Sequence, residues 1–508
     1  MEKRFWGCFL AVFFASAWMP NLHGQENSRY RLAAAMPPDA CVPEAGPREN
    51  TQEIPMPADG TCPEGTRTKY NHTYPWGMMA DPGENFLWIG TASNNIGCRA
   101  MHEGWGNLPS DLQFIAGGRP KDIGYNWCAG RLGAPRAEGR APSDWRPPKL
   151  MRYDLQSGEL LDIEILAPEL QDTTAFRAVG ATEDRVFAAG PSWSNPDSVY
   201  VYQFDRYGHF LSVSRDERLK SIRKIVRGPD GRLYAAVLLP GRRGALAVLG
   251  KEGEMEILAE FPAPAAEIVF DGDKVFVGTW IGLGPQGFGG GEIWAGRLSD
   301  PASFHEIFSY ADFDRNKTAG QVTSIGGMAV YEGKLFWGTM TRPPLTPAMA
   351  LLSLHPQQLL GSYRRAMIFS APLEGDGIGP YRVEYGRGGV HGRMGILDPG
   401  DAYTWSMAPF AGKLYVGALD IQWGALAPDF WLAYSLGLHL PPPHLPRLGA
   451  DLYELSPSGE ASALTLNGFG MPWLMGVRNL VPARGKLYAG ATSAANLLSG
   501  WTLWEVNP

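Results

Sequence analysis

A set of arginine, tryptophan and glutamate side chains could bind a ligand. They are predicted to lie on or next to the inner strands of repeated strand pairs, where some would line a central channel. These candidates for binding at the channel mouth are Trp76, Arg177, Arg223, Glu267, Trp405 and Arg478. Side chains that converge from several repeats could bind an anion or a sugar. Because strand residues alternate between two faces, about half of them are expected to pack between sheets instead.

A second polar group surrounds His391 in a link between two repeats. Arg393 follows it closely, and Arg387 and Asp398 flank the pair. We include His391 and Arg393 among the candidate ligand-binding residues. A solvated loop is nevertheless the preferred interpretation, since a single charged loop seldom identifies catalysis.

One segment has the opening spacing of a calcium-binding loop. Asp312, Asp314 and Asn316 stand at alternate positions, as calcium ligands do. Lys317 and Thr323, however, stand where a glycine and a bidentate glutamate belong. We therefore expect a loop between repeats here, with a structural calcium ion as the weaker alternative.

No other cofactor is predicted from the sequence. The segment 282–287 matches GxGxxG and follows a strand, but it leads into another strand rather than a helix that could hold a pyrophosphate. The quinoprotein docking motif is not reproduced either. With a formal net charge of -7, the chain also offers no basic field for nucleic acid.

The strands that carry the candidate residues belong to a sequence motif that the chain repeats seven times. An apolar strand enters a tight turn, and a second strand of the form Leu-Tyr-x-Gly follows. The copies of the second strand centre on residues 87–90, 186–189, 233–236, 275–278, 335–338, 414–417 and 487–490. A recurrence at about 40 to 50 residues is typical of a β-propeller, in which each repeat forms one blade. We therefore predict an all-β, seven-bladed propeller over residues 74–508.

Each blade of such a propeller has four antiparallel strands, counted outward from the centre. In the sixth repeat we expect them at residues 403–409, 413–419, 451–455 and 461–466. The aromatic residue of the second strand is predicted to pack between neighbouring blades. These aromatic residues are Trp88, Tyr234, Phe276, Phe336, Tyr415 and Tyr488.

The last repeat lacks an outer strand, because the chain reaches Pro508 just after the third one. An unpaired edge there would leave backbone groups exposed and the ring open. We predict that a segment before Tyr74, within an N-terminal extension over residues 25–73, supplies the missing strand. Residues 66–71 are the nearest candidate, and a strand from residues 25–40 would serve equally.

Long insertions are expected on one face of the propeller. Strands alternate in direction, so the links from second to third strands leave from the same face as the links between blades. The insertions cover about 93–147, 280–290, 341–363 and 420–448. Long loops on a rigid scaffold commonly carry binding, so this elaborated face is predicted to be the working face.

Residues 1–24 have the pattern of a signal peptide. Lys3 and Arg4 precede an apolar run, and a polar segment starts at Gln25. An uncleaved anchor is the alternative, and no later stretch is long and apolar enough to span a membrane. We therefore expect a secreted or periplasmic protein.

Export changes the interpretation of the cysteines. Cys41, Cys62, Cys98 and Cys128 remain after removal of the signal peptide, an even set in an oxidising compartment. Two disulfides are expected, with Cys41–Cys62 and Cys98–Cys128 the most local of three pairings.

The blade motif also supports a family resemblance. Segments 468–470, 476–480, 485–490 and 503–506, together with Trp405 to Met407 before 412–417, resemble the blades of secreted, largely uncharacterised bacterial β-propellers with Gly-Lys-Leu-Tyr-x-Gly motifs. The resemblance covers most of the chain after Tyr74. It implies the fold and carries no catalytic residues onto this sequence.

Two functions are consistent with this sequence. The first is a monomeric binding or scaffold module that engages a protein, glycan or small molecule through its elaborated face. The alternative is an exported enzyme, such as a lactonase-like hydrolase or lyase, or a cofactor-dependent dehydrogenase, with its site at the channel mouth. We favour binding, because the inner strands offer mostly apolar or arginine side chains rather than metal ligands.

Overall fold

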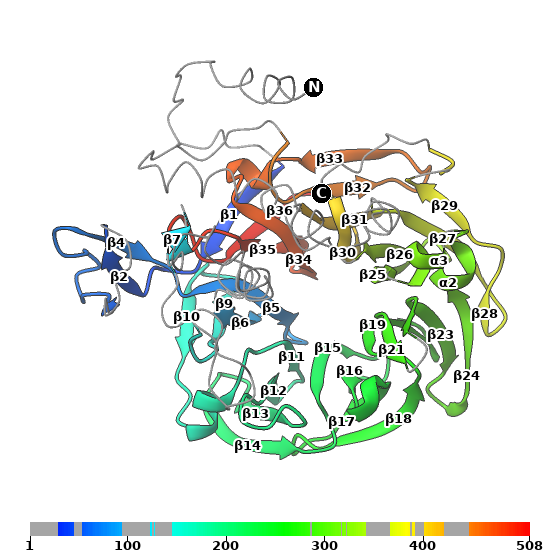
Figure 1. The fold of residues 1–508 in the computed structure, drawn as a ribbon, viewed down its shortest axis with the longest axis horizontal. Coiled ribbons are helices and arrows are strands. Elements are labelled where there is room, and N and C mark those ends of the chain that lie inside the picture. Colours follow the sequence, from blue (N-terminus) through cyan, green and yellow to red (C-terminus); the bar gives the residue numbers. More distant parts are fainter. Residues whose placement is uncertain are drawn as a thin grey trace, which may run out of the picture.

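The computed structural model describes most of the predicted propeller. The described residues are 29–44, 53–93, 122–123, 126–127, 145–284, 287–315, 317–321, 323–341, 366–386, 389–391, 401–420 and 447–508. Their strands pair into antiparallel sheets arranged in a ring (Figure 1). The predicted all-β propeller is confirmed.

The first four blades are separate four-stranded sheets, and the strands of each follow one another in chain order from the inner to the outer edge. Blade 1 is β5 (His72–Ala80), β6 (Phe86–Ser93), β9 (Leu150–Asp154) and β10 (Leu160–Ile163). Blade 2 is β11 (Ala178–Ala181), β12 (Arg185–Pro191), β13 (Val199–Asp205) and β14 (Phe210–Asp216). Blade 3 is β15 (Ser221–Arg227), β16 (Leu233–Leu238), β17 (Gly244–Leu249) and β18 (Met255–Phe261). Blade 4 is β19 (Ala265–Asp271), β20 (Lys274–Thr279), β23 (Glu292–Arg297) and β24 (Asp300–Ser309).

The remaining strands form three further four-stranded sets, joined by the single pairs Met340–Tyr403 and Leu419–Gly476. Blade 5 is β25 (Thr323–Tyr331), β26 (Lys334–Thr341), β27 (Ile368–Glu374) and β29 (Arg382–Tyr385), with β28 (Gly377–Ile378) beside β27. Blade 6 is β30 (Asp401–Phe410), β31 (Lys413–Asp420), β32 (Leu452–Leu455) and β33 (Ala461–Thr465). Blade 7 is β34 (Leu474–Ala483), β35 (Lys486–Ser493), β36 (Thr502–Val506) and β1 (Tyr30–Ala35).

The innermost strands surround the axis of the ring. Each contacts the innermost strand of the next blade, from β5 through β11, β15, β19, β25, β30 and β34 and back to β5. Side chains that leave these strands toward the axis can therefore meet even when their blades are not neighbours. Most residues of the candidate site described below belong to these innermost strands.

A strand from the N-terminal extension closes the ring, as predicted. β1 pairs antiparallel with β36, from Tyr30 opposite Val506 to Ala35 opposite Thr502. Arg31 donates two hydrogen bonds to Glu505, of 3.0 and 2.8 Å. The ring of Tyr30 packs edge-on against Trp504 at 5.9 Å. The last blade thus combines three strands from the end of the chain with one from its beginning.

The nearer candidate for closure, residues 66–71, has another role. β4 (Thr66–Lys69) pairs with β2 (Ala40–Pro43), which also pairs with β3 (Ile54–Pro55). This small sheet projects from the ring (Figure 1). The backbone of β4 is already paired with β2, and the following Tyr70 donates its N–H to the carbonyl of Asn496 at 2.8 Å.

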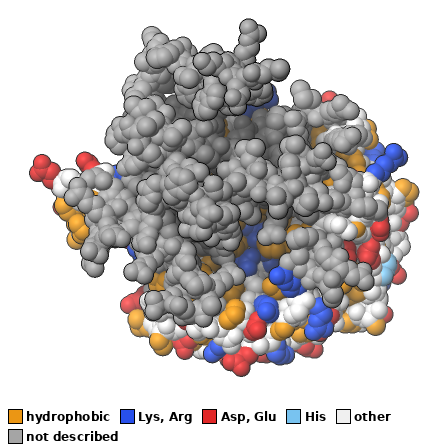
Figure 2. Space-filling model, viewed as in Figure 1, with side chains coloured by type: hydrophobic (Ala, Val, Ile, Leu, Met, Phe, Trp, Pro, Cys, Tyr) orange, Lys and Arg blue, Asp and Glu red, His pale blue; other side chains and the backbone are white. Residues whose placement is uncertain are grey.

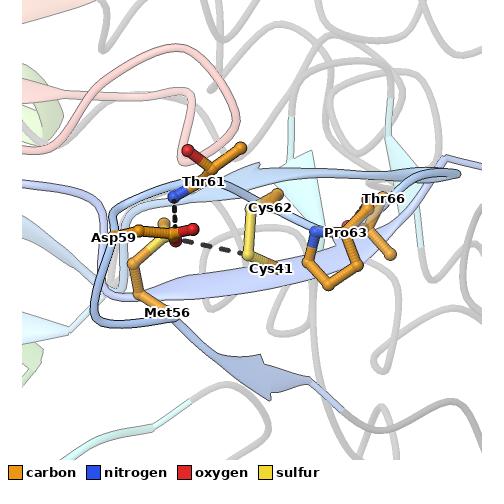
Figure 3. Close-up of a disulfide and its surroundings, with 7 residues drawn as sticks. All are labelled: Cys41, Met56, Asp59, Thr61, Cys62, Pro63 and Thr66. Atoms are coloured by element: carbon orange, nitrogen blue, oxygen red, sulfur yellow. Dashed lines mark hydrogen bonds between the residues drawn. A yellow bond between two sulfur atoms is a disulfide. The ribbon is translucent and has the colours of Figure 1, made fainter.

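A disulfide ties the small N-terminal sheet together (Figure 3). Cys41 on β2 is bonded to Cys62, 21 residues further on, with a Cα–Cα distance of 5.6 Å. The side chain of Met56 lies against Cys41, with a sulfur–sulfur distance of 3.8 Å. This predicted pairing is confirmed. Cys98 and Cys128 lie outside the described residues.

The core of the propeller lies between the faces of neighbouring blades. The predicted aromatic residues of the second strands are buried, with exposed fractions of 8% or less. Tyr488 of blade 7, for example, packs edge-on against Tyr153 of blade 1 at 6.0 Å. These rings hold adjacent sheets face to face, as the sequence predicted.

Tight hairpins connect the first and second strands of each blade. In blade 6, Ala411 and Gly412 both have positive φ, of 46° and 73°, which is the conformation of a type I′ turn. Its twist matches the twist of the strands that it joins. The hairpin loops on this face are therefore short.

The structure places the expected insertions between second and third strands. They separate β6 from β9, β20 from β23, β26 from β27, and β31 from β32. Most residues of these insertions lie outside the described residues, although β7 (Asp122–Ile123) and β8 (Asn126–Trp127) pair within the first. The predicted signal peptide also lies outside. No helix in the described part is long and apolar enough to cross a membrane.

Candidate functional site

Four of the candidate residues occupy β-bulges in innermost strands. In β5, Pro75 pairs with Thr91 and Gly77 pairs with Gly90, so that Trp76 is an extra residue with no partner opposite it. Equivalent register shifts occur at the other three positions. The bulge residues are Trp76 in β5, Arg223 in β15, Trp405 in β30 and Arg478 in β34. A bulge interrupts alternation and turns its side chain in a new direction.

Arg177 lies next to an irregular pair in blade 2. Its N–H donates to the carbonyl of Ala189 at 2.9 Å, and Ala178 is the residue that pairs with Ala189. The side chain of Arg177 donates from Nη1 to the hydroxyl of Ser221 at 2.6 Å. Ser221 begins β15, so this contact links blade 2 to blade 3.

Each of three arginines lies over the face of a tryptophan from another blade. The guanidinium carbon of Arg177 is 4.5 Å from the ring centre of Trp76. The corresponding distances are 4.2 Å for Arg223 over Trp280 and 5.6 Å for Arg478 over Trp405. Stacking of this kind stabilises a cation and fixes the plane of the guanidinium group.

The positive charges of the three arginines act on the phenol of Tyr74. Tyr74 is 5% exposed, and its ring lies 4.8 Å from Trp76 and 5.6 Å from Trp405. Burial raises the pKa of Tyr74, while the positive charges of Arg478, Arg223 and Arg177, together with a hydrogen bond from Arg478, oppose that rise. We call Arg177, Arg223 and Arg478 the arginine cluster.

The arginine cluster lies toward the axis of the ring. Arg223 belongs to blade 3 and Arg478 to blade 7, which are not neighbours, yet their charges act on each other. The rings of Tyr74 in blade 1 and Trp405 in blade 6, which are not neighbours either, lie 5.6 Å apart, so side chains of these inner strands do extend toward the axis. Figure 2 shows lysine and arginine side chains in the middle of the ring.

Several hydrogen-bond donors in the site have no acceptor among the described residues. Arg223 and Arg478 are only 7% and 4% exposed, and the buried Nε of each has no hydrogen-bond partner there. The indole N–H groups of Trp76 and Trp280 are also buried without a partner. Buried polar groups are nearly always satisfied in folded proteins. The site is therefore rich in donors, which suit a ligand rich in acceptors.

A carboxylate that acts on Arg223 already has a partner. Glu267 is 2% exposed and forms an ion pair with Lys224. Burial lowers the pKa of Arg223, and the charges of Arg478 and Arg177 lower it further, against the opposing effects of Tyr74 and Glu267. Within the described residues, neither Arg223 nor Arg478 forms an ion pair. These two arginines thus bring positive charge that no described side chain pairs directly.

His391 does not join the arginine cluster. Its N–H donates to the carbonyl of Glu384 at 3.2 Å, so the link folds back along the outer strand β29. The ring of His391 stacks on Tyr385 at 5.1 Å, and its Nε2 lies 3.5 Å from a carboxylate oxygen of Glu384. The structure therefore places His391 beside the outermost strand of blade 5 rather than at the channel mouth. Arg393 lies outside the described residues.

The other predicted motifs contribute no ligand site in the described structure. Asp312 lies in α2 (Tyr310–Phe313) and Asp314 directly follows that short helix. Asn316 lies outside the described residues, so the weak calcium candidate stays a prediction. Among the described residues, no group of three or more His, Cys, Asp or Glu could hold a metal ion. The GxGxxG segment contributes the paired strands β21 (Gly282–Gly284) and β22 (Gly287–Gly289).

A separate polar cluster joins the small N-terminal sheet to blade 1. Burial lowers the pKa of His72 well below its usual value, and the charges of Lys149 and Arg146 act in the same direction. A ring nitrogen of His72 is hydrogen-bonded to the hydroxyl of Thr91 at 3.0 Å. Nε2 of His72 also lies 3.9 Å from a carboxylate oxygen of Asp39, which directly precedes β2, so His72 connects blade 1 to the N-terminal extension.

Sequence reasoning missed two residues of the site. Tyr74 precedes Trp76 by two positions in the same strand, and Trp280 directly follows β20. Trp280 falls in a predicted insertion, because the second-strand motif ends at Gly278. The only sequence signal for both is an aromatic residue at or next to an inner strand pair, and the bulge that turns Trp76 has no mark in the local sequence.

Comparisons with known proteins concern the fold. No protein-family model matches the chain, and no curated protein matches its sequence. Among solved structures, the chain is similar to a hypothetical selenium-binding protein from Sulfolobus tokodaii, with a TM-score of 0.44 and 11% identity over 72% of this chain and 85% of that chain.

Two further solved structures have similar scores. One is a catalytically inactive virginiamycin B lyase from Staphylococcus aureus, with a TM-score of 0.41 and 9% identity over 87% of this chain and 97% of that chain. The other is the β-propeller domain of the Trilobed protease from Pyrococcus furiosus, with a TM-score of 0.40 and 9% identity over 86% of this chain and 94% of that chain. At these scores the likenesses carry no argument about activity, which must come from the site itself.

Proposed function

We propose that the protein is an exported binding propeller whose arginine cluster holds a small anionic ligand at the centre of the ring. One observation carries the proposal. Arg223 and Arg478 are nearly fully buried, and their Nε groups have no acceptor among the described residues. Buried cations are normally paired, so the arrangement favours a ligand that brings negative charge.

The cluster is costly unless it has a binding role. Burying a charged group without a partner is expensive, and like charges close together add to the cost. Strained or unsatisfied polar arrangements commonly occur at binding sites, where a ligand offsets the cost. Stacking of Arg223 on Trp280 at 4.2 Å keeps the donor edge of its guanidinium group oriented for an anion.

The ligand is expected to enter from the elaborated face. Trp405 and Arg478 each occupy the fifth position of a ten-residue innermost strand, and these strands begin on the face from which the insertions leave. Trp280 stands where the 280–290 connection starts. A ligand held by Arg223 and Trp280 would therefore also lie near the elaborated loops.

Two observations support export. The sequence of residues 1–24 has the pattern of a signal peptide. Cys41 and Cys62 form a disulfide, and disulfides persist mainly in oxidising compartments. Sequencing of the N-terminus of the protein from the exported fraction tests this part, and a chain that begins at Met1 would contradict cleavage.

Isothermal titration calorimetry tests the proposed binding. The full mature chain is titrated with phosphate, sulfate and citrate, and with neutral glucose. We expect at least one anion to bind and glucose not to bind at the cluster. Arg223→Gln should weaken anion binding roughly 10- to 100-fold, as expected for losing one charge-assisted bond.

The exposed Arg232, in the turn that follows β15, provides a matched control. Arg232→Gln removes the same charge from the same blade, away from the centre of the ring. Its anion affinity should equal that of the wild type. The proposal fails if no anion binds, or if Arg223→Gln and Arg232→Gln behave alike.

A further inference from the structure

The number of donors in the arginine cluster restricts the kind of anion that fits it. Trp76 and Trp405 both contact the ring of Tyr74 and are stacked on by Arg177 and Arg478. The charge of Arg223 acts on the same phenol, so the three guanidinium groups lie around Tyr74. A carboxylate offers two oxygens and one negative charge. A phosphate monoester offers three terminal oxygens and a charge of about −1.5 to −2 at neutral pH. Three guanidinium groups around one point therefore match a phosphate monoester better than a carboxylate.

The tryptophans favour recognition through guanidinium edges. Trp76, Trp280 and Trp405 each lie against the face of one arginine. This stacking leaves the N–H edge of each guanidinium group for hydrogen bonds, as in the bond from Arg177 to Ser221. Such edges bind phosphate oxygens in pairs. The buried indole N–H groups of Trp76 and Trp280 are additional donors at the same place.

Partly exposed aromatic rings border the same place. Trp76, Trp280 and Tyr403 are only partly buried, and the ring of Tyr403 lies 6.1 Å from that of Trp405. These rings give the site an apolar border around its cationic centre. The organic part of an ester could pack there while its phosphate group reaches the arginines.

We propose that the ligand is a small organic phosphate monoester, whose phosphate group is held by Arg177, Arg223 and Arg478 and whose organic part packs on the surrounding aromatic rings. This inference rests on the proposed function and adds the chemical class of the ligand. Among the described residues, the charged and titratable groups around this ligand are the three arginines, Tyr74, Tyr403, and the ion pair of Lys224 and Glu267.

Three probes with the same ring and different anionic groups test the class of ligand. Phenyl phosphate, phenyl sulfate and benzoate are titrated into the mature protein at pH 7.5 and pH 5.0. At pH 7.5 we expect phenyl phosphate to bind roughly tenfold or more tightly than either of the others. Its advantage should shrink at pH 5.0, because the second ionisation of a phosphate ester has a pKa of about 6.

Phenyl sulfate also controls for titration of the protein. It has three terminal oxygens but keeps one charge at both pH values, so any protonation of the facing side chains should change its affinity too. The inference is overturned if benzoate or phenyl sulfate equals phenyl phosphate at pH 7.5. It is also overturned if the phosphate advantage does not change with pH. If none of the probes binds and inorganic anions fail as well, the proposed function itself is wrong.

Arginine variants test whether the phosphate group binds at the arginine cluster. Arg478→Lys keeps the charge but loses the planar fork, so it should lower the affinity for phenyl phosphate more than that for benzoate. Arg232→Gln should leave both affinities unchanged. Phosphatidylcholine vesicles that contain phosphatidic acid test whether the phosphate group belongs to a lipid instead of a small ester. Vesicle binding that requires Arg223 but is not displaced by phenyl phosphate would overturn the assignment to a small ester.

Discussion

At the scale of the residue, Arg223 illustrates how a binding group can oppose stability. Its side chain is 7% exposed and lies close enough to Arg478 and Arg177 for their charges to lower its pKa. Stacking on Trp280 and the charge of Glu267 compensate only in part. In the unliganded protein, Arg223 is therefore expected to reduce the free energy of unfolding.

Replacing Arg223 by methionine tests this expectation. Apolar residues of similar size in place of buried charges often stabilise a fold by about 1–4 kcal/mol, while the lost stacking on Trp280 removes up to about 2 kcal/mol. We predict a net increase of about 1 kcal/mol in the free energy of unfolding of Arg223→Met, measured by urea denaturation without anions. Arg232→Gln should change it by less than about 0.5 kcal/mol. A clear loss of stability in Arg223→Met would contradict a strained, unbalanced cluster.

Glu505 has the opposite relation to stability. Burial would raise its pKa, but hydrogen bonds from Arg31 and Lys486 prevail, and the pKa of Glu505 lies below the ordinary value of 4.5. A carboxyl with a lower pKa in the folded chain stabilises the fold above its unfolded pKa, and this contribution is lost as the pH falls through the folded pKa. The bond between β1 and β36 is therefore expected to weaken in acid.

The pH dependence of thermal unfolding tests the role of Glu505. Between pH 7 and pH 3, the wild type should lose stability below about pH 4.5, and Glu505→Gln should start less stable and lose less. Glu217→Gln is the control, because Glu217 faces Arg215 in an exposed pair. If Glu505→Gln and Glu217→Gln have parallel pH profiles, Glu505 does not contribute to closure as described.

At the scale of the element, the strands were predictable and the bulges were not. The strands predicted for the sixth repeat correspond to β30, β31, β32 and β33 within two residues at each end, because apolar alternation and turn residues mark them. A bulge adds one residue to a strand without a characteristic residue type. The direction of Trp76, Arg223, Trp405 and Arg478 therefore could not follow from alternation alone.

The closing strand shows a second limit of local patterns. Tyr30–Ala35 reads YRLAAA and has little alternation, yet it pairs along its length with β36. Residues 66–71 lie nearer to the first blade in the sequence, but β4 is held in the small sheet by pairing with β2. Which segment pairs with β36 therefore depends on contacts between residues that are far apart in the sequence. The resemblance and the repeats could predict that a closing strand exists, but not which one it is.

At the scale of the whole molecule, the site depends on an intact ring. Arginines come from blades 2, 3 and 7, and aromatic rings from blades 1, 4 and 6. In blade 5, the register shift falls at Gly326 and Gly327, and a Cβ on Gly327 would lie 2.8 Å from the backbone of Ser406. Blade 5 thus allows blade 6 to approach closely. The other six blades contribute side chains to the site.

Removal of the closing strand tests this dependence. A mature chain that lacks residues up to Ala35 leaves the edge of β36 exposed and loosens blade 7, which carries Arg478, against blade 1, which carries Tyr74. We predict a fall of several degrees in the unfolding temperature together with weaker anion binding, measured by calorimetry. Unchanged stability in this variant would show that β1 does not hold the ring closed.

The most direct test of the central claim is the position of a bound anion. We would soak crystals of the mature protein in selenate, a tetrahedral dianion, and collect data at the selenium absorption edge. The account predicts an anomalous peak at the centre of the ring, within hydrogen-bonding distance of Arg223 and Arg478, that is absent from crystals of Arg223→Met. Peaks confined to the outer surface of the blades, with none at the arginine cluster, would contradict it.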